Sequence, residues 1–165
     1  MVLKPEEVIF GLDDRAVVVA SMARLAKDRD GWLNLSPVLP DGVDQPRQGL
    51  LRFLGARGPE ALLGTWVPGP RTGEGWAPTT IGLQHAAGRR IVARLAEAGH
   101  PVPEGWRVTQ DHLARGLVAT VPDDADPDQV LVWLVGAAEH VATLPLTGRW
   151  CAAFYRKGSA GRRGI

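Results

Sequence analysis

The order in which strand and helix patterns follow one another from Leu62 onward constrains the fold of this chain most. Short runs that alternate apolar and polar residues predict strands, and longer runs with helical spacing predict helices. The strands are expected at 62–67, 106–111, 117–121 and 149–155, and the helices near 80–98 and 127–141. Because this order is β-α-β-β-α-β, it predicts an α+β, ferredoxin-like split βαβ fold with both helices on one face of an antiparallel sheet.

The second of these helices has the clearest boundaries in the sequence. Asp126 suits the N-cap, Pro127 suits the first helical position, and Gln129 stands where a capping box needs a side chain that reaches back. Apolar residues at helical spacing predict the buried side of both helices. The residues expected between the helices and the sheet are Leu83, Ile91, Leu95, Val130, Leu134 and Val141.

The N-terminal part of the chain is expected to add a helix and a short strand to this core. The helix is predicted near 14–29, and the strand at 32–38, where Pro37 ends it or places it at a sheet edge. The run LLRFL at 50–54 fits either a strand or a helical turn. Further along, Gly116 supplies the positive φ that a hairpin between the two middle strands of the core needs.

These elements predict one α+β domain over residues 1–156, followed by a tail. Within the domain, 1–61 is expected to be the N-terminal extension and 62–156 the ferredoxin-like core. The tail, 157–165, is basic and is expected to be flexible, because Ile165 is its only apolar anchor.

The composition excludes several classes of protein. The net charge of +1 gives no overall field that would attract nucleic acid or an anionic membrane. Cys151 is the only cysteine, so no internal disulfide is possible. The first residues contain no apolar signal core, and the longest apolar run, 130–138, is about half a membrane span. We therefore expect a cytoplasmic protein that does not contact the membrane.

Arginine outnumbers lysine 16 to 3, and alanine, glycine, proline and valine are abundant. This bias is typical of GC-rich coding and favours a bacterial source with a GC-rich genome. It also weakens any inference from single arginines, since many stand where another genome would encode lysine.

The first candidate site combines the loose loop at 68–78 with the helix predicted after it. Free N–H groups at the start of that helix could hold an anion, with an arginine closing over it and His85 acting as acid or base. Trp76 in the loop could be a lid over the pocket or an anchor for a partner. The expected ligand-binding residues are Arg71, Trp76, Thr79, Thr80 and Arg89. The alternative, which we favour, is an ordinary amphipathic helix with a solvated flank.

The second candidate site is the pair Asp111 and His112, which with His85 make up the candidate catalytic residues. Neighbours on a strand point to opposite faces, so the pair is not a dyad by itself. The histidines, at positions 85, 100, 112 and 140, have no pair at metal-binding spacing, and we expect no metal site. No phosphate-binding loop motif ends in Gly-Lys-Ser or Gly-Lys-Thr, and we expect no cofactor.

These observations favour a non-catalytic accessory or protein-interaction domain that binds a protein partner or forms a homo-oligomer. The alternative is a small enzyme or ligand-binding domain that takes an anionic small molecule at 68–90. A third hypothesis, nucleic-acid binding through the basic tail, is disfavoured because the strand at 117–121 offers no aromatic residue for base stacking.

Overall fold

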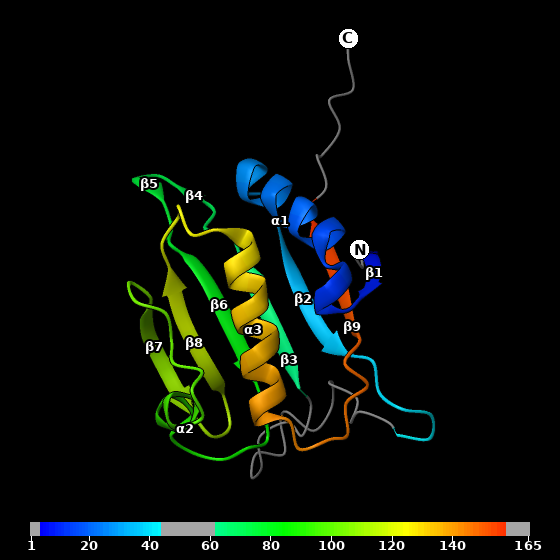
Figure 1. Cartoon of the computed structure of the whole chain (residues 1–165). Helices are drawn as coiled ribbons and strands as arrows, with labels where there is room; N and C mark the ends of the chain where they lie inside the picture. The colour runs from blue at the N-terminus through cyan, green and yellow to red at the C-terminus, as the bar shows by residue number, and fades with distance from the viewer. Residues whose placement is uncertain (1–3, 44–61, 158–165) are drawn as a thin grey trace.

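The structure, a computed structural model, describes residues 4–43 and 62–157, and its main feature is a seven-stranded antiparallel sheet (Figure 1). From edge to edge the order is β1-β9-β2-β3-β6-β8-β7. The strands are β1 (Glu6–Phe10), β2 (Gly31–Pro37), β3 (Leu63–Val67), β6 (Thr79–Gln84), β7 (Arg107–His112), β8 (Gly116–Val121) and β9 (Trp150–Arg156). A small separate hairpin, β4 (Arg71–Thr72) and β5 (Gly75–Trp76), interrupts the connection from β3 to β6.

The α-helices of the described residues lie together on one face of this sheet (Figure 1). They are α1 (Ala16–Asp28), which follows a short 3-10 helix at Leu12–Asp14, α2 (Ile91–Glu97) and α3 (Pro127–Val141). The central helix, α3, contacts β3 and β6 beneath it and packs against both α1 and α2. The predicted α+β class, the antiparallel sheet and the placement of the helices on one face are confirmed.

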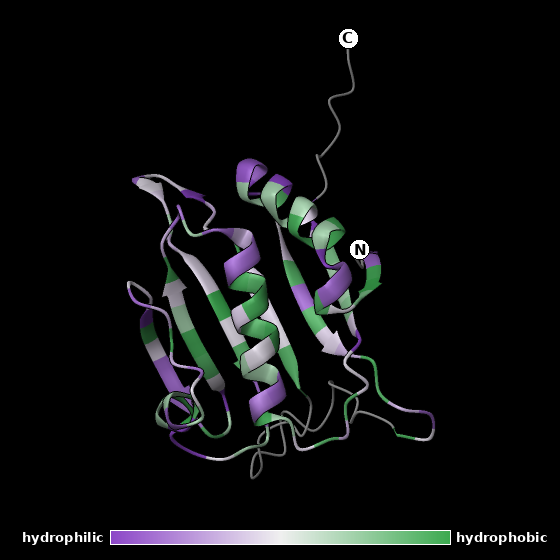
Figure 2. Ribbon diagram, viewed as in Figure 1, coloured by the Kyte–Doolittle hydropathy of each residue, from purple (hydrophilic) through white to green (hydrophobic). Residues whose placement is uncertain are grey.

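The hydrophobic core fills the space between the helices and the sheet. Alternate residues of the inner strands are buried, and they line up across the sheet: Trp66 on β3 pairs with Leu33 on one side and with Ile81 on the other. Figure 2 shows this alternation along β6, and the apolar middle of α3. All six core residues expected from the sequence are buried, namely Leu83, Ile91, Leu95, Val130, Leu134 and Val141.

Several local predictions are confirmed together with their physical cause. The Asp126 side chain caps α3 by accepting a hydrogen bond of 3.0 Å from the backbone N–H of Asp128. Gly116 has φ 82° at the start of β8. A Cβ at this position would also lie 2.4 Å from the carbonyl oxygen of Leu83, so the hairpin needs glycine here for two reasons.

The helix predicted at 80–98 is wrong in its first half. Thr79–Gln84 is the strand β6, and helix forms only over Ile91–Glu97. Ile81 and Leu83 alternate with Thr80 and Gly82, so this segment fits a strand with one buried face as well as it fits a helix. It follows that neither Thr79 nor Thr80 caps a helix.

The ferredoxin-like arrangement is not confirmed, because the sheet is larger than the predicted four strands. Strand β2, which the sequence placed in an N-terminal extension, lies inside the sheet between β9 and β3. A further strand, β1, was not predicted and forms one edge beside β9. Pro37 is the last residue of β2 and pairs with Trp150, so it ends an inner strand and does not mark an edge.

Two predicted segments fall mainly outside the described residues: 50–54 entirely, and the tail at 157–165 except for Lys157. The backbone N–H of Lys157 donates to the carbonyl of Asp30 at 2.6 Å and continues the pairing of β9. In the part of the chain that the structure describes, no helix is long and apolar enough to cross a membrane.

Candidate functional site

The residues singled out from the sequence fall into two groups at opposite ends of β6. Arg71, Trp76 and Thr79 lie at its beginning, whereas His85 and Arg89 lie just past its end. The six residues of β6 separate the two groups by roughly 17 Å along the strand. The single anion site that required Arg71 and His85 to converge is therefore not assembled.

The first group is a small cluster of stacked side chains on the β4–β5 hairpin. The guanidinium of Arg29 lies over the Trp76 ring at 4.6 Å, and that of Arg71 lies at 6.0 Å. Arg29 also pairs with Asp123 at 3.4 Å and donates to the carbonyl of Gly69 at 3.1 Å. The indole, 54% exposed, thus lies beside two cations on an outer hairpin.

The two threonines have different positions. Thr79 is buried, and its hydroxyl donates to Asp123 at 3.2 Å and accepts from the N–H of Gly69 at 3.4 Å. These bonds fix the loop where β6 begins. Thr80, the next residue, points to the opposite face of the sheet, as neighbours on a strand must.

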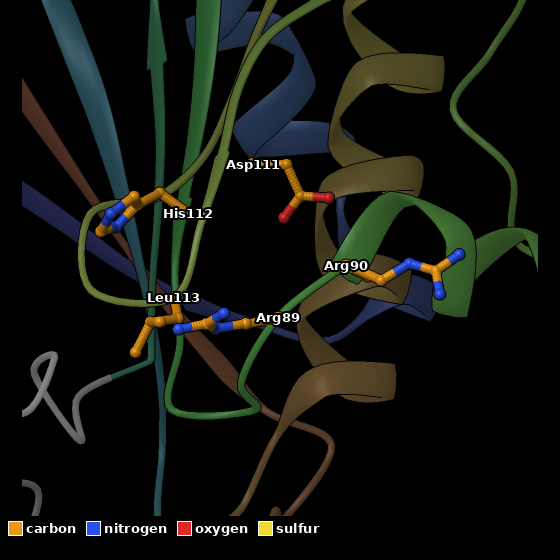
Figure 3. A pocket seen from close by; sticks show the side chains of 5 residues that line it. All are labelled: Arg89, Arg90, Asp111, His112 and Leu113. Atoms are coloured by element: carbon orange, nitrogen blue, oxygen red, sulfur yellow. The ribbon is translucent and has the colours of Figure 1, made fainter.

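The second group borders a hollow of about 410 Å³ at the other end of the sheet (Figure 3). Its lining comes from the loop between β6 and α2 and from the end of β7 with the following turn: Arg89, Arg90, Asp111, His112 and Leu113. In Figure 3 the Arg89 side chain extends toward Leu113, on the same side as His112, and Arg90 extends the other way. The structure thus brings together Arg89, Asp111 and His112, as well as Arg90, which the sequence analysis did not single out.

Asp111 is the only acidic residue in this lining, and both of its oxygens are engaged. They accept hydrogen bonds from the backbone N–H groups of Ile91 at 3.2 Å and Val92 at 3.0 Å. These are the first two residues of α2. The side chain of the N-cap residue, Arg90, makes no capping hydrogen bond to this helix. Asp111 therefore caps the start of α2 from strand β7, and its role is to hold the helix in place.

His112 is held by the turn between β7 and β8. Its Nδ1 accepts the backbone N–H of Ala114 at 3.0 Å and that of Arg115 at 3.2 Å. When the ring is neutral, Nδ1 is an acceptor, so the hydrogen is on Nε2. His112 can therefore offer one N–H donor to a ligand while it stabilises the turn.

His85 is packed inside the protein and is only 2% exposed. Its Nδ1 accepts the backbone N–H of Ala87 at 3.2 Å, and its Nε2 has no hydrogen-bond partner among the described residues. Burial lowers the pKa of His85, with a smaller opposing effect from the nearby Asp111 carboxylate and a further lowering from Arg94. A buried, neutral imidazole in this position is a packing residue in the loop that carries Arg89 and Arg90.

The face of the sheet that turns away from the helices, here called the open face, was missed by the sequence analysis. Its inner-strand side chains are half-buried, and the helices of the described residues lie on the other side of the sheet. On the five inner strands it consists of Cys151, Ala153, Tyr155, Trp32, Asn34, Ser36, Leu63, Thr65, Val67, Thr80, Gly82, Gln84, Val118 and Thr120.

None of these inner-strand residues is charged. The edge strands add Ile9, which is 53% exposed, and one exposed charge each, Glu7 on β1 and Arg107 on β7. The signal in the sequence was the lack of charged residues at alternate positions of the segments that form the inner strands, of which 79–84 had been predicted as helix. It could be recognised only once these strands were known to share one sheet.

Cys151 lies on the open face, half-buried. Burial raises the pKa of its thiol, and the neighbouring Glu7 carboxylate raises it further. A thiol in this environment stays protonated at neutral pH, which makes Cys151 a weak nucleophile.

Comparison with known proteins does not identify a relative. No family model matches the chain, and no curated protein and no solved structure shows significant similarity to it.

Proposed function

We propose that this protein is a non-catalytic protein-interaction domain that binds another protein chain through the open face of its sheet. The observation that carries the proposal is the absence of Asp, Glu, Lys and Arg from that face on all five inner strands. An antiparallel sheet with one face in water normally alternates apolar residues inside with polar and charged residues outside.

The composition of the open face supports this proposal. The centres of protein–protein interfaces are depleted in charged residues and enriched in aromatic ones. The open face has both properties, since Trp32 and Tyr155 stack on it with ring centroids 5.0 Å apart and an interplanar angle of 5°. We expect the protein to act in the cytoplasm of a bacterium, as its composition predicts.

Site-specific photo-crosslinking in the source organism tests the proposal. A photoreactive amino acid at Val118, on the inner strand β8 of the open face, should join the chain to a second polypeptide on illumination. The matched control is the same amino acid at the exposed Ala96 on α2, where we expect no adduct. Adducts at both positions, or at neither, would contradict the assignment of the open face as the binding surface.

A second function, binding of a small anion, is favoured by the hollow at the end of the sheet. The free groups in its lining are donors: the guanidinium groups of Arg89 and Arg90, and Nε2–H of His112. No ion pair is formed by either arginine among the described residues, and the Asp111 oxygens already accept two backbone N–H groups. Guanidinium groups suit phosphate and carboxylate oxygens.

Titration with inorganic phosphate, followed by NMR, tests this second function. Phosphate should shift the amide signals of Leu113 and of the residues around it, and Arg89→Gln should weaken the response at least severalfold. Arg24→Gln on α1 is the control, because it removes one arginine from a different part of the surface. An equal loss in both variants would show a general charge effect and no site.

A further inference from the structure

We infer that the partner of the open face is a second copy of this chain, related by a two-fold axis that runs along the central strand, β3. The inference rests on the proposed function, because it names the occupant of the same surface. Its first support is the strand order, in which β3 is the fourth of seven, with three strands on each side. A two-fold axis along β3 therefore places β1 of one copy across from β7 of the other.

The charges at the two edges suit this arrangement. The open face is uncharged between its edges, and it has Glu7 at the β1 edge and Arg107 at the β7 edge. Both side chains are exposed, and neither forms an ion pair among the described residues. The two-fold axis brings Glu7 of each copy beside Arg107 of the other and makes two opposite-charge pairs with no like-charge pair.

The positions of these residues along the strands agree with such pairing. Across the sheet, Glu7 lies in the row that runs through Thr65 and Val118 to Gln110. Arg107 lies in the neighbouring row, because it pairs with Thr120, which is two residues from Val118. Since a two-fold axis along the strands keeps each row in place, the two charges are offset by roughly 7 Å, which long side chains can span.

The sizes of the side chains are also complementary across the proposed axis. Trp32 and Tyr155 lie on the β1 side of β3, in the same row as Thr80 and Thr120 on the β7 side. The axis therefore places the aromatic pair of one copy against the two threonines of the other. Large groups meet small ones in this row, and on the axis itself the β3 residues Leu63, Thr65 and Val67 face their own symmetry copies.

The twist and area of the sheet are compatible with this contact. A two-fold axis along a strand maps a twisted sheet onto one with the same twist, so the two faces can stay evenly spaced at about 10 Å. Seven strands about 4.8 Å apart, with a length of roughly 20 Å, give roughly 600 Å² per copy. Twice this area is at the low end for specific interfaces, so we expect a reversible dimer.

Charge exchange at the two edges, measured by sedimentation equilibrium on the full chain, tests the inference. Glu7→Arg alone sets arginine against arginine, and Arg107→Glu alone sets glutamate against glutamate. Each should raise the dimer dissociation constant by about tenfold. The double variant should restore the dimer, and so should an equal mixture of the two single variants, because each then meets the opposite charge. Glu97→Arg on α2 is the control and should leave the dimer unchanged.

Val118→Lys distinguishes the failure of this inference from the failure of the proposed function. We expect it to abolish the dimer, with Thr65→Lys as a second variant in case Val118→Lys does not fold. If either lysine substitution dissociates the dimer but the charge exchange at Glu7 and Arg107 leaves its dissociation constant unchanged, the two copies bind through the open face about a different axis, and the proposed axis is wrong. A chain that is monomeric at every concentration, yet crosslinks through Val118 to another protein in cells, overturns the second-copy inference alone.

Discussion

Asp111 on β7 is the residue whose replacement tests most directly how α2 is held in place. Its two oxygens accept the N–H groups of Ile91 and Val92 from outside the helix. The helix has only seven residues, so it depends on such contacts and on its packing more than on its own hydrogen bonds. Asp111→Ala removes both acceptors at once and leaves a surface alanine behind.

The expected loss follows from these contacts. Loss of a helix cap costs about 1 kcal/mol, and loss of a negative charge beside a helix start costs a further 0.3–1 kcal/mol or so. Because the side chain is exposed, we take about 1.5 kcal/mol for the whole effect. For a chain of this size, that lowers the melting temperature by about 3–6 °C. Asp111→Asn keeps one acceptor and should lose less.

Two measurements check this prediction. Thermal unfolding gives the loss of stability, with Asp124→Ala, in an exposed turn, as the control that should change nothing. Hydrogen exchange should speed up at the amides of Ile91 and Val92 before it does so in β6 or β8. If the Asp111→Ala protein melts like the parent and both amides keep their protection, α2 is not capped by Asp111 and the reasoning fails.

Three further predictions concern single residues. Because burial lowers the pKa of His85, its folded-state pKa lies below the unfolded value of 6.5. The stability that the neutral ring contributes is therefore present above pH 6.5 and is lost as the pH falls through the folded-state pKa. In urea unfolding, the free energy of unfolding of His85→Gln should fall less on acidification than that of the parent protein. Asp126→Ala should cost about 1 kcal/mol of unfolding free energy through loss of the α3 cap, as measured by urea denaturation. Gly116→Ala should destabilise the protein by several times that amount, since a Cβ there would lie 2.4 Å from the Leu83 carbonyl oxygen; a soluble protein with an unchanged melting temperature would contradict this.

Elements with strong local signals could be predicted from the sequence, and those that depend on distant partners could not. The α3 helix carries its own start signal in Asp126 and Pro127, and the β7–β8 hairpin carries Gly116. In contrast, Thr79–Gln84 satisfies both the helical and the strand spacing, and only pairing with β3 and β8 decides between them. Burial was easier to predict than secondary structure: Leu83 is buried as expected, although it lies on a strand.

The candidate site shows the same division. The sequence pointed to Arg89, Asp111 and His112, which do meet at one hollow, but it grouped Arg89 with Arg71 and Thr79 and treated Asp111 and His112 as a separate site. That error follows directly from reading β6 as a helix, because a strand of six residues is more than twice as long as a helix of that length. The open face could not be foreseen, since it exists only through the order of strands in the sheet.

The position of β9 has a consequence for the way this protein is made. In the described structure β1 pairs only with β9, and Glu6 is matched with Phe154. A ribosome that has synthesised β1 must therefore translate the chain as far as β9 before that strand meets its neighbour. Strand β2 can pair earlier with β3, but its other edge also waits for β9. Contacts between residues so far apart in sequence form slowly, and the waiting strand edges can pair with the wrong partner. We expect nascent chains stalled before Trp150 to be protease-sensitive and prone to aggregation, and to depend on cellular folding factors until the last strand is inserted.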